Sequence, residues 1–94
     1  MEIRSLIWLP AIIEKLEFKH SVDTEEVEEV FRNTPTLRRG PKGQRVGENL
    51  YKAYGQTDAG RYLFVVFIYK LNHRALVLSA RDMTESERRL FRKR

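Results

Sequence analysis

The residues of this sequence that could do chemistry are cations, a histidine and a tyrosine. The candidates are Arg61, Arg81, Lys19, His20 and Tyr51. The planar fork of an arginine binds two phosphate oxygens and stays charged. A histidine titrates near neutral pH, and a lysine or tyrosine can move a proton when its neighbours shift its pKa. These residue types therefore suit the binding of phosphate charge combined with proton transfer.

Arg81 is the candidate with the most informative spacing. Ser79 and Arg81 follow Val77 at the two-residue period of a strand, which predicts one strand face that is apolar at first and polar at its end. At the edge of a sheet, where such a strand ends, a charged side chain can lie half-buried. The structural alternative is that Arg81 pairs with Glu85 or Glu87 of the helix that follows.

His20 and the tyrosines have structural alternatives as well. His20 is in helical register with Leu16, so it can equally be a packed histidine at a helix end. Tyr51 and Tyr54 lie in a predicted strand, where tyrosines commonly pack on the sheet.

Composition excludes several classes of site. The sequence has no cysteine, which removes disulfides, thiolate nucleophiles and cysteine-based zinc sites. His20 and His73 are the only imidazoles. We find no P-loop, dinucleotide-binding glycine pattern, HExxH or GxSxG motif. We therefore expect no cofactor and no metal.

The charge is distributed unevenly along the chain. Residues 1–30 carry a net charge of −5, and residues 31–69 and 70–94 carry +5 each. A basic field of this kind attracts RNA, DNA or an acidic partner, although a solvated surface is an equal alternative. We predict RNA contacts from the cations of a glycine-containing loop and of the last helix: Arg38, Arg39, Lys42, Arg45 and Arg88.

The longest apolar run, Tyr62 to Tyr69, is too short to cross a bilayer. The sequence begins Met-Glu and carries no small-residue cleavage signature. We therefore expect a cytoplasmic protein with no membrane contact.

The elements that must position these residues follow from periodicity and from helix-start signals. We expect a strand over 2–9, a helix from Pro10, and a second helix from a capping box of Asp23 and Glu26 to about Asn33. A short strand and a basic loop occupy 34–48. Strands follow over 49–57, 61–69 and 74–81. In the strand 61–69 both the odd-numbered and the even-numbered positions are mostly apolar, which predicts that other elements cover both of its faces. A final helix starts at Thr84.

These elements predict an α+β fold. Its sheet is antiparallel, with four to five strands, two N-terminal helices and one C-terminal helix. Residues 1–94 form one domain in this prediction.

Three ordered motifs give the sequence a resemblance to a known family. They are Trp8 with Lys19-His20-x-Val22 and Glu25-Glu26-x-x-Glu29-Val30-Phe31, then Ala53-Tyr54-Gly55-Gln56-Thr57-x-x-Gly60-Arg61, and last Leu78-Ser79-Ala80-Arg81-x-x-Thr84-x-x-Glu87-Arg88. In this order and spacing the sequence resembles the BrnT family of bacterial toxins over residues 8–91.

The resemblance implies a RelE-like fold and a metal-independent endoribonuclease toxin of a type II toxin–antitoxin pair. It implies a cognate antitoxin as partner, RNA as substrate, and operator DNA bound only through the antitoxin complex. In such a reaction the 2′-hydroxyl of the RNA attacks its own phosphate. We assign Arg81 and Arg61 to phosphate charge, His20 to proton transfer, and Lys19 and Tyr51 to substrate positioning.

The sequence departs from the family pattern at two positions. Leu16 stands where the family often has an asparagine, and Leu50 stands where an arginine often precedes the aromatic residue of the Tyr51 strand, although Arg45 is close by. These departures keep two alternatives open. One is a nucleic-acid-binding module without catalysis, and the other is a degenerate toxin that is retained to bind its antitoxin.

Overall fold

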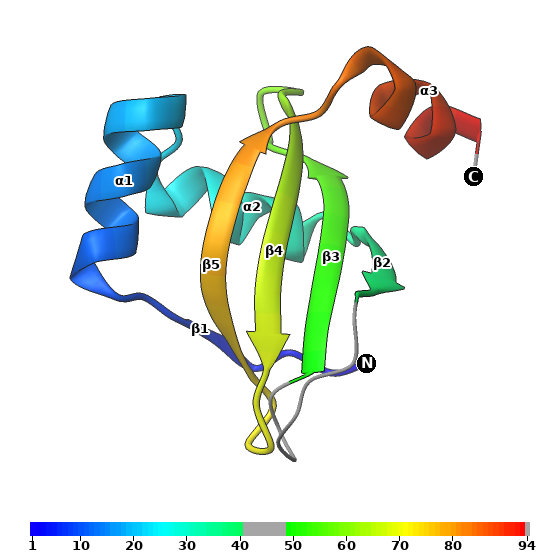
Figure 1. The fold of residues 1–94 in the computed structure, drawn as a ribbon. Helices are drawn as coiled ribbons and strands as arrows, with labels where there is room; N and C mark the ends of the chain where they lie inside the picture. The colour runs from blue at the N-terminus through cyan, green and yellow to red at the C-terminus, as the bar shows by residue number, and fades with distance from the viewer. Residues whose placement is uncertain (41–48, 94) are drawn as a thin grey trace.

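A computed structural model describes residues 1–40 and 49–93 of the chain. Five strands form one sheet in the order β1-β5-β4-β3-β2, and three helices accompany it (Figure 1). In chain order the elements are β1 (Ser5–Ile7), α1 (Pro10–His20), α2 (Thr24–Arg32), β2 (Thr36–Arg39), β3 (Asn49–Gln56), β4 (Tyr62–Tyr69), β5 (Arg74–Asp82) and α3 (Glu85–Lys93). The predicted α+β class and element order are confirmed.

The sheet is mixed, which corrects the prediction of a purely antiparallel one. Strands β2 to β5 pair antiparallel, whereas β1 pairs parallel with β5, with Leu6 opposite Ala75. Short turns force the hairpin-linked strands β3, β4 and β5 to alternate in direction. No turn links β1 to β5, so only packing sets its direction. Strand β1 is also shorter than the predicted 2–9.

The helix starts lie where the sequence predicts them. Pro10 opens α1, and Asp23 and Glu26 form the predicted capping box of α2, in which the Glu26 backbone N–H donates to the Asp23 carboxylate over 2.8 Å. Thr84 and Glu87 form the second box at the start of α3. These devices satisfy backbone N–H groups that the first helical turn leaves without partners.

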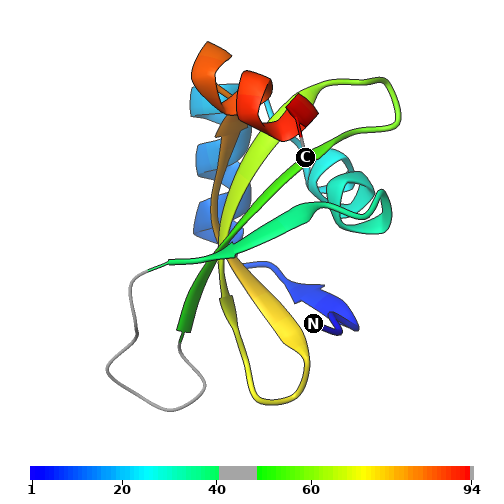
Figure 2. The same ribbon diagram turned by 90° about the vertical axis from the view of Figure 1, so that its right-hand side faces the viewer.

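Helices α1 and α2 cover one side of the sheet and enclose the core. Figure 1 shows α2 crossing behind the sheet and α1 lying along its β5 edge, and Figure 2 shows α2 on one side of the strands. Leu63, Val65 and Phe67 of β4 face this side and are fully buried, together with Val27 and Val30 of α2. Burial of these apolar side chains is the main stabilising contribution to the fold.

The second side of the sheet is only half-buried, which corrects the prediction that β4 is covered on both faces. We call this side the open face. Its members lie in register across the strands: Thr36 and Arg38 of β2, Leu50, Lys52, Tyr54 and Gln56 of β3, Tyr62, Phe64, Val66 and Ile68 of β4, and Leu76, Ser79 and Arg81 of β5. Among the described residues, α3 is the one helix that contacts this face, and it does so at one end.

A β-bulge corrects the predicted face of Val77. Val77 pairs with Phe67, whereas Ser79 pairs with Val66, and the register shifts between these two positions of β4. The extra residue in β5 reverses the alternation of side chains. Val77 therefore packs in the core while Ser79 and Arg81 lie on the open face.

In the part of the chain that the structure describes, no helix is long and apolar enough to span a membrane.

Candidate nucleic-acid interface

Arg81 occupies the end of β5 on the open face, where protein groups hold its guanidinium from two directions. Its Nη1 and Nη2 donate to the two carboxylate oxygens of Glu87 over 2.8 and 3.0 Å, and Nη1 also donates to the carbonyl of Asp82. The guanidinium lies over the ring of Phe64, 4.3 Å from the ring centroid. The structural alternative for Arg81, a pair with Glu87, is therefore confirmed.

This pairing leaves part of the Arg81 fork available. The guanidinium carries five N–H groups, and among the described residues Nε and one hydrogen of Nη2 take no acceptor. The hydrogen bond to Glu87 raises the pKa of Arg81 and lowers the pKa of Glu87, so both groups are charged at neutral pH. A cation with a fixed plane and unused donors can bind an anion bidentately.

Tyr54 lies next to this pair on β3. The centroid of its ring is 5.1 Å from that of Phe64, and its hydroxyl has no hydrogen-bond partner among the described residues. Burial, followed by the charge of Glu87, raises the pKa of Tyr54, while the charges of Arg38 and Arg81 act in the opposite direction. At neutral pH the phenol therefore keeps its proton and is available as a donor.

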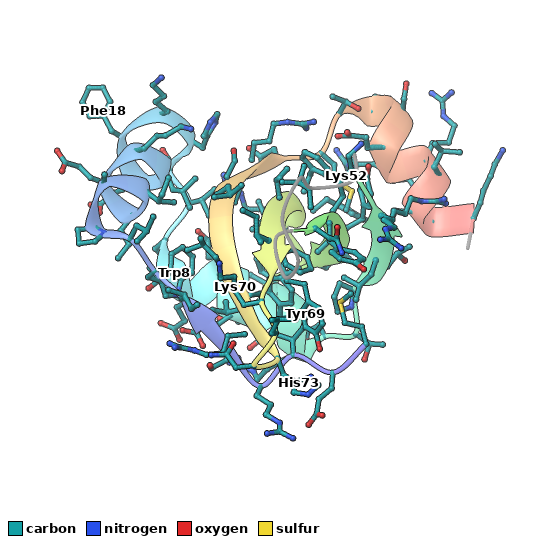
Figure 3. The ribbon with its side chains drawn as sticks, turned by 60° about the horizontal axis from the view of Figure 1, so that its bottom comes forward. Trp8, Phe18, Lys52, Tyr69, Lys70 and His73 are labelled. Carbon is teal, nitrogen blue, oxygen red and sulfur yellow. The ribbon has the colours of Figure 1, made fainter. Side chains whose placement is uncertain are left out.

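Further cations and aromatic rings extend the open face at the α3 end. Arg88 of α3 lies over the ring of Tyr62 at 4.6 Å, and Phe91 meets the same ring edge-on at 6.0 Å. Lys52 lies on the open face in register with Arg38 (Figure 3). Exposed cations beside aromatic rings suit single-stranded nucleic acid, because the cations neutralise phosphates and the rings stack on bases.

Arg61 is not part of this face. All three of its nitrogens donate to protein oxygens on the helix-covered side, at the carboxylates of Asp82 and Glu26 and the carbonyls of His20 and Ser21. The hydrogen bond to Asp82 is the largest cause that raises the pKa of Arg61. This arrangement ties α1, α2 and β5 together at one end of the sheet. The structure thus gives Arg61 a structural function and leaves it little capacity for phosphate.

The other predicted catalytic residues do not gather around Arg81. Lys19 and His20 end α1 on the Arg61 side, where the charge of His20 helps to lower the pKa of Asp82. Tyr51 lies on the helix-covered side and stacks on Phe67 at a centroid distance of 5.8 Å. The structure therefore divides the five candidates between the two sides of the sheet.

The predicted RNA-binding cations are also divided. Arg38 and Arg88 lie at the open face, whereas Arg39, one residue along β2, pairs with Tyr51 and belongs to the opposite side. Lys42 and Arg45 lie outside the described residues.

Sequence reasoning missed Lys52 and Phe64 as members of this candidate site, and it did not select Tyr54. A signal was present in the alternation of β3 and β4, since Lys52, Tyr54, Phe64 and Arg81 all fall in register once the strands are paired. The obstacle was the bulge in β5, which had to be known before Arg81 could be aligned with its neighbours.

Comparisons with known proteins identify a family model and solved structures that resemble this chain. A family model described as the ribonuclease toxin BrnT of type II toxin–antitoxin systems matches residues 8–87. The crystal structure of the Brucella abortus ribonuclease toxin BrnT superposes with a TM-score of 0.62 at 18% sequence identity, over 86% of this chain and 97% of that one. This structural likeness concerns the fold. A search of curated proteins finds no match.

Proposed function

The chain belongs to the BrnT family, the ribonuclease toxins of type II toxin–antitoxin systems, and we propose that it cleaves RNA on the open face, with Arg81 binding the reacting phosphate. The observation that carries this proposal is the geometry of Arg81. Its guanidinium is fixed by Glu87 and Phe64, yet it keeps two donors unused among the described residues. Donors fixed before the substrate arrives stabilise developing charge without reorganisation.

The proposed reaction uses the 2′-hydroxyl of the substrate as nucleophile. The 2′-oxygen forms a bond to phosphorus, the bond from phosphorus to the 5′-oxygen breaks, and the products are a 2′,3′-cyclic phosphate and a 5′-hydroxyl end. Arg81 stabilises the added negative charge on the phosphoryl oxygens. Tyr54, which is protonated at neutral pH and next to Arg81, donates a proton to the leaving 5′-oxygen.

His20 ends α1 near Asp82, on the side of the sheet opposite Arg81, so we assign the 2′-hydroxyl proton to solvent water and not to His20. Lys52 and Arg88 contact the phosphates that flank the cleaved one, and Arg38 contacts the RNA beside them. Lys19 is placed with His20 and stays a proposed positioning residue. We assign Arg61 and Tyr51 to stability.

The two departures from the family pattern bear on this proposal in different ways. Leu16 is buried in the core with 1% of its surface exposed, so its side chain contributes to packing. Leu50 pairs with Ile68 at the end of the open face away from Arg81. Neither position adjoins Arg81 or Tyr54, which supports retained catalysis.

The test is cleavage of single-stranded RNA by the purified chain in the presence of EDTA. We expect products with 2′,3′-cyclic phosphate ends, and no cleavage where a 2′-deoxynucleotide replaces the reacting one. Arg81→Lys and Tyr54→Phe should each reduce cleavage by about 100-fold, the typical effect of losing one such group. His20→Ala should leave cleavage per folded molecule unchanged, because His20 lies on the other side of the sheet from Arg81.

Tyr69→Phe is the matched control for Tyr54→Phe. It removes the same hydroxyl at the other end of the sheet, where Tyr69 donates to the carbonyl of Glu2 and contacts His73 (Figure 3). It should lower the melting temperature and leave cleavage per folded molecule unchanged. RNA binding that weakens steeply with salt but yields no cleavage would instead identify a binding module.

Membership of a type II system implies an antitoxin partner. We propose that this antitoxin covers basic surface of the chain and that operator DNA is bound only through the complex of the two proteins. Thermal melts with and without the antitoxin test the pairing, because a partner that binds only the folded state must raise its stability.

A further inference from the structure

A pocket of about 190 Å³ lies beside Arg81, between the open face and α3. Strand β2 contributes Thr36 and Arg38 to its wall, β3 contributes Tyr54, and α3 contributes Glu87, Leu90 and Phe91. The pocket is smaller than the roughly 300 Å³ at which sites for drug-sized ligands begin. Its size therefore suits one small flat ring system.

The pocket walls suit a nucleobase in particular. Tyr54 and Phe91 are aromatic and Leu90 is aliphatic, so they can contact the faces of a ring by stacking and dispersion. Among the described residues, the Thr36 hydroxyl and the Arg38 guanidinium have no hydrogen-bond partner. A hydroxyl and an arginine fork are groups that commonly read base edges.

The position of the pocket links it to the proposed phosphate site. Glu87 lines the pocket and also holds Arg81, and Tyr54 lines the pocket while its ring contacts Phe64, on which Arg81 lies. A phosphate on the unused donors of Arg81 would therefore place an adjoining base within reach of the pocket.

We propose that this pocket takes one unpaired nucleobase next to the cleaved phosphate and so determines where along an RNA the chain cuts. This inference rests on the proposed function for its biological meaning. Stacking holds any base, whereas well-placed hydrogen bonds to a base edge discriminate by about 1–3 kcal/mol, and 1.4 kcal/mol corresponds to about tenfold in an equilibrium or rate. A base preference of about tenfold or more at one position is therefore expected.

The experiment uses two pocket variants and one control. Thr36→Ile fills the pocket with a β-branched side chain that suits a strand. Leu90→Ala removes one wall at a residue that is already 67% exposed, so folding should be unaffected. Leu71→Ala makes the same change at a residue that is 75% exposed, in the turn between β4 and β5. Melting curves confirm that each variant is folded.

The first measurement is the distribution of cleavage sites in a pool of random-sequence RNA. Wild type and Leu71→Ala should share a base bias at one position beside the cut. In Thr36→Ile and Leu90→Ala this bias should fall by about tenfold. An unchanged bias in both folded pocket variants would overturn the pocket and leave the ribonuclease proposal intact.

The second measurement separates failure of the pocket from failure of the proposed function. Binding of 3′-nucleoside monophosphates and of inorganic phosphate is followed by NMR titration, which needs no cleavage. A wild type that binds a nucleotide more tightly than phosphate, with the excess lost in Thr36→Ile, supports the pocket even if no RNA is cut. Equal affinity for nucleotides and phosphate would overturn it.

Discussion

Replacement of Arg61 tests whether this arginine acts in folding or in catalysis. Its guanidinium donates to Asp82 over 2.7 and 3.1 Å, to Glu26 over 3.2 Å, and to the carbonyls of Ser21 and His20 over 2.8 and 2.9 Å. Arg61→Ala removes all of these bonds at once. It leaves the ends of α1 and α2 without their link to β5.

The magnitude follows from the exposure of the partners. The Asp82 side chain is 63% exposed, so that ion pair contributes less than about 1 kcal/mol. Glu26 and Arg61 are 25% and 26% exposed, and each of the remaining hydrogen bonds contributes about 0.5–1.5 kcal/mol. The sum is about 2–5 kcal/mol, which lowers the melting temperature of a domain of this size by roughly 10–40 °C.

The assay measures thermal unfolding and RNA cleavage on the same preparation of Arg61→Ala. We expect a lower melting temperature, with cleavage per folded molecule unchanged at a temperature where the variant is folded. Arg4→Ala is the matched control, because Arg4 pairs with Glu2 at the surface and both side chains are at least 60% exposed. This control should change the melting temperature little. A normal melting temperature with cleavage lost would refute the structural assignment and return Arg61 to the active site.

Two further predictions concern stability. The hydrogen bonds from Arg61 and Arg81 lower the pKa values of Asp82 and Glu87 in the folded chain. The stability that these pairs contribute is therefore complete above the unfolded-state pKa values of about 4, and it is lost as the pH falls through the lowered folded-state values. The gap in melting temperature between wild type and Arg61→Ala should therefore narrow below about pH 4, and a gap that stays constant down to pH 2 would contradict this. Gly55→Ala places a methyl group 2.9 Å from the Val30 side chain and should cost about 1–3 kcal/mol in urea unfolding, whereas an unchanged midpoint would show that α2 can move aside.

The sequence by itself determined the elements whose causes are local. The capping box of Asp23 and Glu26 lies within four residues, as does that of Thr84 and Glu87, so both helix starts were predictable. Short turns between β3, β4 and β5 made the antiparallel hairpins predictable in the same way. The pair of Arg81 and Glu87, six residues apart, was foreseen as an alternative for the same reason.

Only the tertiary structure decided which residues share a side of the sheet. Arg61 meets the carbonyl of His20, which is 41 residues away, and no local pattern specifies a contact at that distance. The bulge in β5 places Arg81 beside Tyr54 and Phe64 while Tyr51 packs on the opposite side. One inserted residue reverses the alternation of a strand, and the resulting face is visible only once all the strands are paired. The sequence therefore indicated residue types that suit phosphate binding, and folding left unused donors on Arg81 while it engaged all the nitrogens of Arg61 in contacts with protein oxygens.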